Sequence, residues 1–224
     1  MILIEFKNYK AVLFDLDGVI YNTEPLRFKS YQIFFDKKFG KIIPDNLFGK
    51  MVGHSQHRNF KYLLKHLNIE KYNFSTFKIE RQEILIGIIE KYVTEDSSLI
   101  QLIDNLIKFG FKIGLVSNSD TEYIDFLLKK LKIDKYFQIV VSGVDYKTFK
   151  PDPLLYTIAI KMLRENKKHV IAIEDSPSGV IAAENAGLIC LGIKRPYTTL
   201  SSINKSLIFS SLNQINSKLV RQLA

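Results

Sequence analysis

The sequence predicts an α/β protein with a Rossmann-like, three-layer core built on a parallel sheet and with an inserted all-helical subdomain. Two observations lead to this prediction. Short apolar runs alternate with helical patterns along most of the chain, which is typical of βαβ units. Residues 23–96 interrupt that alternation with helical patterns and breakers but no convincing strand. We therefore expect residues 1–22 and 97–224 to form the core and residues 23–96 to form the helical insert.

Six apolar runs predict the strands, and the first of them leads directly into two carboxylates. The runs are residues 11–14, 112–116, 138–141, 170–173, 189–193 and 207–209. Four helical patterns lie between them, at residues 99–109, 121–131, 154–163 and 180–186. Because strands and helices of this length alternate, we expect right-handed crossovers and a parallel sheet.

The ends of these helices carry local signals. A Ser with a Glu three residues later predicts a capping box, Asp-Pro and Ser-Pro pairs predict helix starts, and glycines predict helix ends. In that order the residues are Ser119 with Glu122, Asp152 with Pro153, Ser176 with Pro177, Gly110 and Gly187.

The insert has a composition of its own. Its helical patterns lie at residues 26–39, 56–67 and 77–93. It also contains 12 of the 27 aromatic residues of the chain. A helical segment this rich in aromatic side chains can bury a small core, so we expect it to form a second subdomain.

The charge of the chain is basic but evenly distributed. The net charge is +9, with 13 Lys and Arg against 9 Asp and Glu in residues 23–96 and 19 against 14 elsewhere. No basic tract stands out, which favours a solvated, lysine-rich surface over a nucleic-acid site. The excess charge still favours anionic small substrates.

Composition also bears on location. No apolar window approaches the length of a membrane span, and the first residues lack a secretory signal. The single cysteine, Cys190, cannot form an internal disulfide and stands in an apolar strand, where a buried core thiol is expected. A reducing cytosol fits best. We therefore expect a cytoplasmic monomer that binds neither nucleic acid nor membrane.

Chemically useful side chains follow four of the predicted strands. They are Asp15 and Asp17 after the first, Ser117 and Asn118 after the second, Lys150 after the third, and Glu174 and Asp175 after the fourth. The carboxyl ends of parallel strands meet at one edge, where open α/β sheets bind ligands. Clustered carboxylates need a hard cation, and oxygen ligands favour Mg²⁺. Mg²⁺ and Lys150 would then neutralise a phosphate held by Ser117 and a helix start.

Four motifs carry a resemblance to a known family. They are D-L-D-G-V at residues 15–19, V-S-N-S at 116–119, K-P-D-P at 150–153 and E-D-S-P-S-G-V at 174–180. With these motifs the chain resembles the haloacid dehalogenase superfamily of phosphatases, in the group with a helical cap that includes β-phosphoglucomutase and phosphoglycolate phosphatase. The motifs cover the core from residue 11 to about residue 193, while the cap agrees in position, size and helicity rather than in residues.

The resemblance implies a Mg²⁺-dependent phosphatase that acts on a small phosphorylated metabolite, such as a sugar phosphate, phosphoglycolate or a nucleoside monophosphate. Asp15 would be the nucleophile that forms an aspartyl-phosphate. Asp17 would protonate the leaving alcohol and then activate water. Ser117 and Lys150 would be the other catalytic residues.

The same resemblance implies the metal ligands. Mg²⁺ would be bound by Asp15, by Asp17 through its carbonyl, and by Asp175. Glu174 would be a further or water-mediated ligand, although a supporting role or a charge at a helix start would also explain it.

Substrate-binding candidates come from the second motif and from the cap. Asn118 follows Ser117 at a strand end. In the cap, the candidates lie in the segment V-G-H-S-Q-H-R-N-F, close to a loop that Gly49 and Gly53 flank before a helix; they are His54, Ser55, His57 and Arg58. The alternative is that Ser55 caps this helix and that His57 and Arg58 are solvated side chains in its first turn.

Alternatives to a phosphatase stay open. A mutase resembling β-phosphoglucomutase shares this core and cap, but it usually carries a His where this chain has Arg27 and an Arg where it has Gln56. A catalytically silent binding module would keep the motifs without turnover. A dehalogenase needs no second acid and a phosphonate hydrolase usually lacks one, so Asp17 counts against both. A nucleic-acid binder would show salt-sensitive binding of DNA or RNA.

Overall fold

The chain divides into two compact units. The computed structural model describes residues 4–52, 55–200 and 207–224. Met1–Asn22 and Thr94–Ala224 form one unit, called here the α/β unit, and Thr23–Val93 form the other, called the helical unit. The second boundary falls after Val93 rather than after Asp96, where the sequence analysis placed it.

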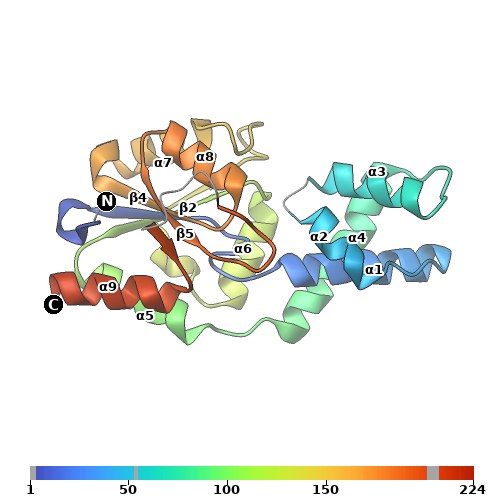
Figure 1. The fold of residues 1–224 in the computed structure, drawn as a ribbon, viewed down its shortest axis with the longest axis horizontal. Coiled ribbons are helices and arrows are strands. Elements are labelled where there is room, and N and C mark those ends of the chain that lie inside the picture. The colour runs from blue at the N-terminus through green and yellow to red at the C-terminus, as the bar shows by residue number, and fades with distance from the viewer. Residues whose placement is uncertain (1–3, 53–54, 201–206) are drawn as a thin grey trace. The chain divides into compact units, whose positions relative to one another are not determined.

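A six-stranded parallel sheet forms the centre of the α/β unit (Figure 1). Its strands are β1 (Ala11–Phe14), β2 (Lys112–Ser117), β3 (Ile139–Ser142), β4 (Val170–Glu174), β5 (Ile189–Ile193) and β6 (Ile208–Phe209). Their order is β3-β2-β1-β4-β5-β6, and each neighbouring pair runs parallel. The predicted fold class is confirmed, and each predicted strand is present with ends shifted by at most one residue.

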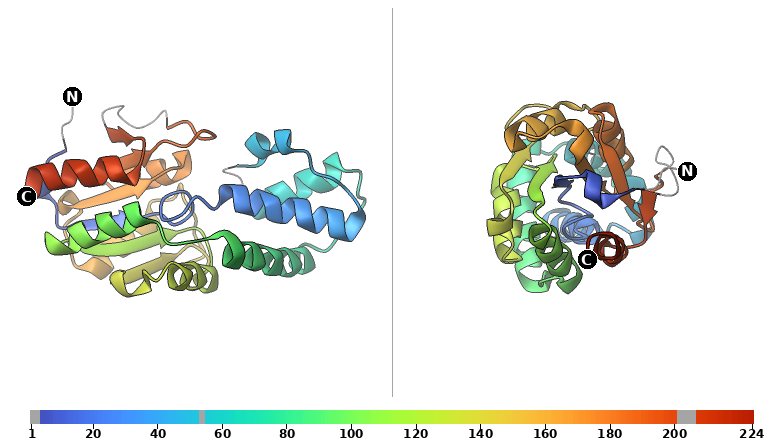
Figure 2. Two further views of the ribbon diagram at one scale, coloured as in Figure 1. Left: turned by 90° about the horizontal axis from the view of Figure 1, so that it is seen from below. Right: turned by 90° about the vertical axis from the view of Figure 1, so that its left-hand side faces the viewer.

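Helices cover both faces of this sheet. They are α5 (Ser97–Lys108), α6 (Thr121–Lys130), α7 (Leu154–Leu163), α8 (Pro177–Asn185) and α9 (Leu212–Leu223). α5 and α9 lie side by side on one face, where Asn105 Nδ2 donates to Asn216 Oδ1 at 2.9 Å, and α7 and α8 cover the other (Figures 1 and 2). Their apolar stripes pack on the strands and complete the three layers.

β1 lies at the point where the strand order reverses. All four of its residues are buried, and it pairs with β2 on one side and β4 on the other. The chain moves outward through β2 and β3 and then returns to β4 across β1. In open α/β sheets the crevice at such a point binds ligands. Because the strands are parallel, the residues that follow β1 to β4 meet at this edge.

The start of α6 differs from the prediction. Its N-cap is Asp120 rather than Ser119, and Asp120 Oδ1 accepts the Tyr123 N–H at 2.9 Å. A carboxylate suits the positive end of a helix better than a hydroxyl does. The Ser119 hydroxyl donates instead to Asp17.

α7 starts one residue later than its Asp-Pro pair predicts. Its N-cap is Pro153, which has no N–H to satisfy, and Asp152 Oδ1 accepts the Leu154 N–H at 2.8 Å. The other predicted ends are confirmed. They are Ser176 with Pro177 at the start of α8, and Gly110 and Gly187, which take positive φ after α5 and α8.

The helical unit has an apolar core of its own, as its aromatic content predicts. Its helices are α1 (Glu24–Phe39), α2 (Phe48–Met51), α3 (Gln56–His66) and α4 (Phe74–Tyr92). The core consists of Phe28, Tyr31, Phe34, Phe35, Ile43, Leu47, Met51, Phe60, Leu63 and Phe77. α1 packs against α4, while the short helix α2 was not predicted.

One charged side chain is buried in this unit. Arg81 of α4 is 1% exposed, and its Nη1 donates to Ser30 Oγ at 2.8 Å. Its guanidinium carbon lies 4.7 Å from the centroid of the Tyr31 ring. These contacts join α4 to α1 through a hydrogen bond and a cation–π interaction.

Two expectations from composition can be compared with the fold. Cys190 in β5 is buried, as predicted. In the parts of the chain that the structure describes, each helix is too short or too polar to cross a membrane.

Candidate active site

Lys150 and Asp15 form the centre of the candidate site. Asp15 follows β1, and its N–H donates to the Ile173 carbonyl of β4 at 3.0 Å, so the backbone fixes it at the sheet edge. Lys150 Nζ donates to Asp15 Oδ1 at 2.5 Å and to the Val116 carbonyl at 2.7 Å. Both charged side chains are buried. The ends of β1 and β2 and the loop after β3 thus meet at the ammonium group of Lys150.

Glu174 is the second carboxylate partner of this lysine. Lys150 Nζ donates to Glu174 Oε1 at 2.6 Å, and the Tyr156 hydroxyl donates to the same oxygen at 2.7 Å. Glu174 Oε2 accepts the Asp175 N–H at 3.2 Å and the Ser176 hydroxyl at 3.3 Å. With donors at both oxygens, this buried carboxylate holds Lys150 in place.

Two glycines allow the carboxylates to approach the backbone. Gly18 has a φ of +94°, and a Cβ added there would lie 1.9 Å from Asp175 Oδ2. A Cβ added at Gly179 of α8 would lie 2.0 Å from the Glu174 carboxyl group. Only glycine fits at these positions without movement, and the close approach brings Asp175 beside the loop that follows β1.

Three buried carboxylates lie close together, and two of them, Asp15 and Glu174, pair with the buried ammonium group of Lys150. Oxygens of Asp15, Glu174 and Asp175 lie within 4.8 Å of one another. The pKa of Asp15 is raised to about 8, first by burial and then by the charge of Glu174, although Lys150 acts in the opposite direction. Burial lowers the pKa of Lys150, but Asp15 and Glu174 outweigh it and raise this pKa above its usual value.

The charge balance of this group is negative. Three carboxylates and one ammonium group give a formal charge of −3 + 1 = −2 when all four are ionised. Buried charge of one sign is costly unless a counter-charge compensates it. A divalent cation bound by these oxygens would supply that counter-charge.

Asp17 has a different set of partners. Ser119 Oγ donates to Asp17 Oδ2 at 2.9 Å, and the Tyr123 hydroxyl donates to Asp17 Oδ1 at 3.0 Å. Ser119 lies just before the N-cap of α6, and Tyr123 lies in its first turn. The side chain of Asp17 is not one of the three clustered carboxylates, so metal binding through its carbonyl stays a prediction.

Ser117 and Asn118 shape the loop after β2. Ser117 Oγ accepts the Ser119 N–H at 3.1 Å. Asn118 Oδ1 accepts the backbone N–H of Lys150 at 2.8 Å. Asn118 therefore ties this loop to the residue whose side chain pairs with Asp15. Contact of Ser117 or Asn118 with a substrate stays a prediction.

The cap candidates lie in the helical unit. His54 is outside the described residues. Ser55 caps α3, and its hydroxyl oxygen accepts the Arg58 N–H at 3.3 Å. Ser55 and Arg58 are both exposed. This geometry agrees with the capping alternative for Ser55, while substrate contact by these residues stays a prediction.

Other polar side chains of the helical unit line a cavity of about 60 Å³. Its lining consists of Glu24, Arg27, Phe28, Tyr31, Phe48, Met51, Val52, Gln56 and Asn59. Gln56 and Asn59 stand next to the predicted Ser55 and Arg58 in the sequence. Two of the side chains that enclose this space are therefore sequence neighbours of the ones that the loop pattern singled out.

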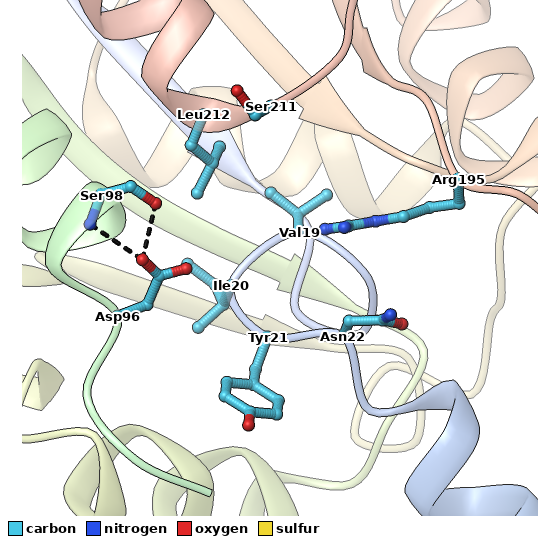
Figure 3. A pocket seen from close by; sticks show the side chains of 9 residues that line it. All are labelled: Val19, Ile20, Tyr21, Asn22, Asp96, Ser98, Arg195, Ser211 and Leu212. Carbon is cyan, nitrogen blue, oxygen red and sulfur yellow. Dashed lines mark hydrogen bonds between the residues drawn. The ribbon is translucent and has the colours of Figure 1, made fainter.

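A larger cavity, of about 380 Å³, lies in the α/β unit beside the loop that follows β1 (Figure 3). It is lined by Val19, Ile20, Tyr21, Asn22, Asp96, Ser98, Arg195, Ser211 and Leu212. Arg195 reaches toward this loop, and its Nε donates to the Gly18 carbonyl at 2.8 Å. Because none of the predicted site residues lines this cavity, we do not assign it to the catalytic site.

Comparisons with known proteins identify the family. Residues 12–193 match the haloacid dehalogenase-like hydrolases. The chain belongs to this family. A protein from Thermotoga maritima named "Phosphorylated carbohydrates phosphatase" is 29% identical to this hydrolase over 195 residues, which cover 87% of each chain. YhcW of Bacillus subtilis, named as a candidate phosphatase, is 31% identical over 199 residues, which cover 84% of this chain and 85% of that one.

A solved structure agrees with this assignment. It is a crystal structure from Thermotoga maritima, titled as a candidate β-phosphoglucomutase, with a TM-score of 0.80 and 26% identity. It covers 95% of this chain and 99% of that chain. The resemblance to haloacid dehalogenase-like phosphatases that the four motifs carried is therefore confirmed.

Sequence reasoning missed three side chains that shape the site of this hydrolase. Tyr123, Tyr156 and Arg195 contact the predicted general acid, the second carboxylate and the loop after β1. Tyr123 and Tyr156 stand in the first turns of helices that begin soon after functional strand ends, which is a signal that could have pointed to them. Arg195 carries no such signal, because its contact depends on the path of the chain after β5.

Proposed function

We propose that this hydrolase is a Mg²⁺-dependent phosphatase that hydrolyses a small phosphorylated metabolite through an aspartyl-phosphate on Asp15. The observation that carries the proposal is the buried cluster of Asp15, Glu174 and Asp175, of which the first two pair with Lys150. Excess negative charge and oxygen ligands suit a hard divalent cation, and a phosphate ester binds such a cation. The family and the phosphatase names of the relatives support the same class of reaction.

The residues present fit Mg²⁺. The clustered donors are carboxylate oxygens within 4.8 Å of one another. The formal charge of the group with Lys150 is equal in magnitude and opposite in sign to that of a divalent cation. Asp15, Asp175 and the Asp17 carbonyl would hold the ion, with Glu174 as a further or water-mediated ligand. When bound, Mg²⁺ would offset the negative charge of the phosphate and so favour attack by a carboxylate.

Asp15 is the nucleophile in this mechanism. Its carboxylate attacks phosphorus in line, and the bond from Asp15 to phosphorus forms as the bond from phosphorus to the leaving alcohol breaks. Lys150 pairs with Asp15 at rest and with phosphate oxygens during transfer. The Ser117 hydroxyl and backbone N–H groups near the start of α6 bind the remaining phosphate oxygens.

Asp17 is the general acid and then the general base. Its carboxyl group gives a proton to the oxygen of the leaving alcohol. The resulting carboxylate then takes a proton from the water that attacks the aspartyl-phosphate. This second step restores Asp15 and releases inorganic phosphate.

The substrate that we propose is a small monoester such as a sugar phosphate, phosphoglycolate or a nucleotide-like monoester. The Thermotoga maritima relative named for phosphorylated carbohydrates supports a sugar phosphate. The net charge of +9 favours an anionic small molecule. The helical unit would supply cap side chains that read the rest of the substrate. We also propose a cytoplasmic monomer without a nucleic-acid partner.

A phosphomutase is the second candidate, because the similar crystal structure carries a β-phosphoglucomutase title. In a mutase the phosphate on Asp15 would return to a sugar instead of passing to water. Arg27 and Gln56 count against it, since mutases of this kind usually carry His and Arg at these positions.

Phosphate release from a panel of phosphorylated metabolites tests the proposal. The panel contains sugar phosphates, phosphoglycolate and nucleoside monophosphates, each with Mg²⁺ or with EDTA. Asp15→Asn removes the nucleophile, and Asp125→Asn is the matched control because Asp125 is exposed on α6. We expect metal-dependent release by the wild type and the control, and a rate lower by about 10³-fold or more in Asp15→Asn.

Three outcomes would contradict the proposal. Full activity of Asp15→Asn would exclude the aspartyl-phosphate mechanism. Conversion of a sugar phosphate into its isomer without phosphate release would favour the mutase. No reaction with any member of the panel, from a folded and Mg²⁺-loaded wild type, would favour a silent binding module.

A further inference from the structure

We infer that Tyr123 is a positioning residue for the general acid and acts through Asp17. Its hydroxyl donates to Asp17 Oδ1 at 3.0 Å. Tyr123 stands outside the four sequence motifs and lies on α6, a helix from which the sequence analysis used only the backbone N–H groups at its start. The inference rests on the proposed function, in which Asp17 gives its proton to the leaving alcohol.

Tyr123 is anchored at both ends. Its backbone N–H donates to Asp120 Oδ1 at 2.9 Å, which fixes it in the first turn of α6. Its side chain is 3% exposed. A buried phenol needs a hydrogen-bond partner, and Asp17 supplies one. The position of the hydroxyl is therefore set by the helix and the core rather than by solvent.

Asp17 is held through both of its carboxylate oxygens. Ser119 donates to Oδ2 at 2.9 Å, and Tyr123 donates to Oδ1. A carboxylate with a donor at one oxygen can still rotate, whereas donors at both oxygens fix its plane. Because the efficiency of proton transfer depends on placement, a fixed plane favours reaction.

A hydroxyl suits this task because it can both donate and accept. It donates to Asp17 while Asp17 is a carboxylate, and it can remain a partner when Asp17 carries a proton. During transfer, the bond from Asp15 to phosphorus forms, the bond from phosphorus to the alcohol breaks, and the proton moves from Asp17 to the departing oxygen. Without the Tyr123 hydroxyl, the carboxyl group can turn away from that oxygen and the transfer slows.

Substrates with different leaving groups can distinguish a role of Tyr123 in proton transfer from a purely structural role. An alkoxide is a strong base and needs a proton as it leaves, whereas p-nitrophenolate is a stable anion and needs little help. A defect confined to the general acid therefore slows alkyl phosphates more than p-nitrophenyl phosphate. The value of kcat/KM is the right measure, because it covers the steps up to the aspartyl-phosphate and omits its hydrolysis.

The test compares Tyr123→Phe with wild type on two esters in the presence of Mg²⁺. These are p-nitrophenyl phosphate and the alkyl phosphate of the metabolite panel that the wild type hydrolyses fastest. We expect kcat/KM for the alkyl phosphate to fall about tenfold or more, and that for p-nitrophenyl phosphate to fall less than about threefold. The ratio of the two values is taken within each preparation, so a smaller folded fraction cancels.

Tyr156→Phe is the matched control. It also removes a buried tyrosine hydroxyl, but that hydroxyl donates to Glu174 rather than to Asp17. Both esters should then slow by the same factor. Asp17→Asn sets the scale, since it removes the acid itself and should show the largest selectivity against the alkyl phosphate.

The outcomes distinguish this inference from the proposed function. An unchanged ratio of kcat/KM values in Tyr123→Phe, with an active wild type, overturns the role of Tyr123 and leaves the phosphatase intact. A wild type that hydrolyses neither ester overturns the proposed function, and the role of Tyr123 falls with it. A ratio that shifts in Tyr123→Phe and not in Tyr156→Phe supports the inference.

Discussion

The two units of the chain bury charge in different ways. The α/β unit buries Lys150 within a group of three carboxylates, so negative charges outnumber the positive one. The helical unit buries Arg81 beside the Ser30 hydroxyl and the face of the Tyr31 ring. The first arrangement concentrates like charges, and the second places a guanidinium beside a hydrogen-bond acceptor and an aromatic face.

The charged group around Lys150 is typical of a binding site, whereas the contacts of Arg81 stabilise the fold. Burial and the neighbouring charge of Glu174 both raise the pKa of Asp15, so the group around Lys150 is strained electrostatically. Strain of this kind is typical of functional sites, where a ligand relieves it. The contacts of Arg81 with a hydroxyl and an aromatic face are themselves favourable and stabilise the packing of α1 on α4.

The largest effect is expected for Lys150→Met. Loss of the ammonium group leaves Asp15 and Glu174, in a cluster of three carboxylates, without their lysine partner, and the phosphate loses a contact. We expect phosphate release to fall by about 10³-fold or more, and the free energy of unfolding without metal to fall by about 3 kcal/mol. Release assays and chemical denaturation in EDTA measure these two quantities.

The effect of Mg²⁺ on the melting temperature gives a second test of the Lys150→Met prediction. Mg²⁺ should raise the melting temperature of Lys150→Met more than that of the wild type, because the variant has a larger excess of negative charge to offset. Activity should not return. Lys161→Met is the control, since Lys161 is exposed on α7 and should change neither property. Equal shifts of the melting temperature in variant and wild type would show that charge balance does not govern this group.

A smaller effect is expected for Arg81→Met. The apolar side chain keeps much of the volume but loses the hydrogen bond to Ser30 and the contact with the Tyr31 ring. We expect the free energy of unfolding to fall by about 2 kcal/mol, equally with and without Mg²⁺. Lys65→Met, at an exposed position of α3, is the control in urea denaturation. A stabilised Arg81→Met would mean that the desolvation of this charge outweighs its contacts.

The clustering of carboxylates at one edge of the α/β unit could be predicted because it follows from a repeating pattern. The candidate carboxylates and Ser117 stand at the ends of apolar runs, and parallel strands bring such ends together, while Lys150 reaches the same edge from the loop after β3. Local chemistry predicted Ser119 as the cap of α6, and this prediction was wrong, because the cap is Asp120. The Ser119 hydroxyl instead donates to a long-range partner, Asp17, which is 102 positions away.

The side chains that sequence reasoning missed depend on contacts of the same kind. The hydrogen bond from Tyr123 to Asp17 spans 106 positions, and that from Arg195 to Gly18 spans 177. In the helical unit, periodicity predicted helices and an aromatic core but not which polar side chains face the cavity. Successive residues of a helix point about 100° apart, so a choice between Ser55 and Gln56 requires the packed structure.

The smallest effect is expected at Cys190. This residue is buried in β5, in register with Ala172 of β4. Burial raises the pKa of its thiol well above the usual value, and the charge of Glu174 raises it further. We expect Cys190→Ala to lower the free energy of unfolding by about 1 kcal/mol and to leave phosphate release unchanged.

Alkylation tests the same thiol in the wild type. Because the reactive form is the thiolate, iodoacetamide near pH 8 should leave Cys190 unmodified in the native protein and modify it in urea, as mass spectrometry would measure. Cys190 lies next to β4, so the charge of Glu174 raises the pKa of its thiol. The hydrogen bonds of Lys150 and Asp15 described above do not involve Cys190. Rapid modification of the native protein, or a loss of phosphate release in Cys190→Ala, would show that the charged group around Lys150 reaches β5 rather than ending at Glu174.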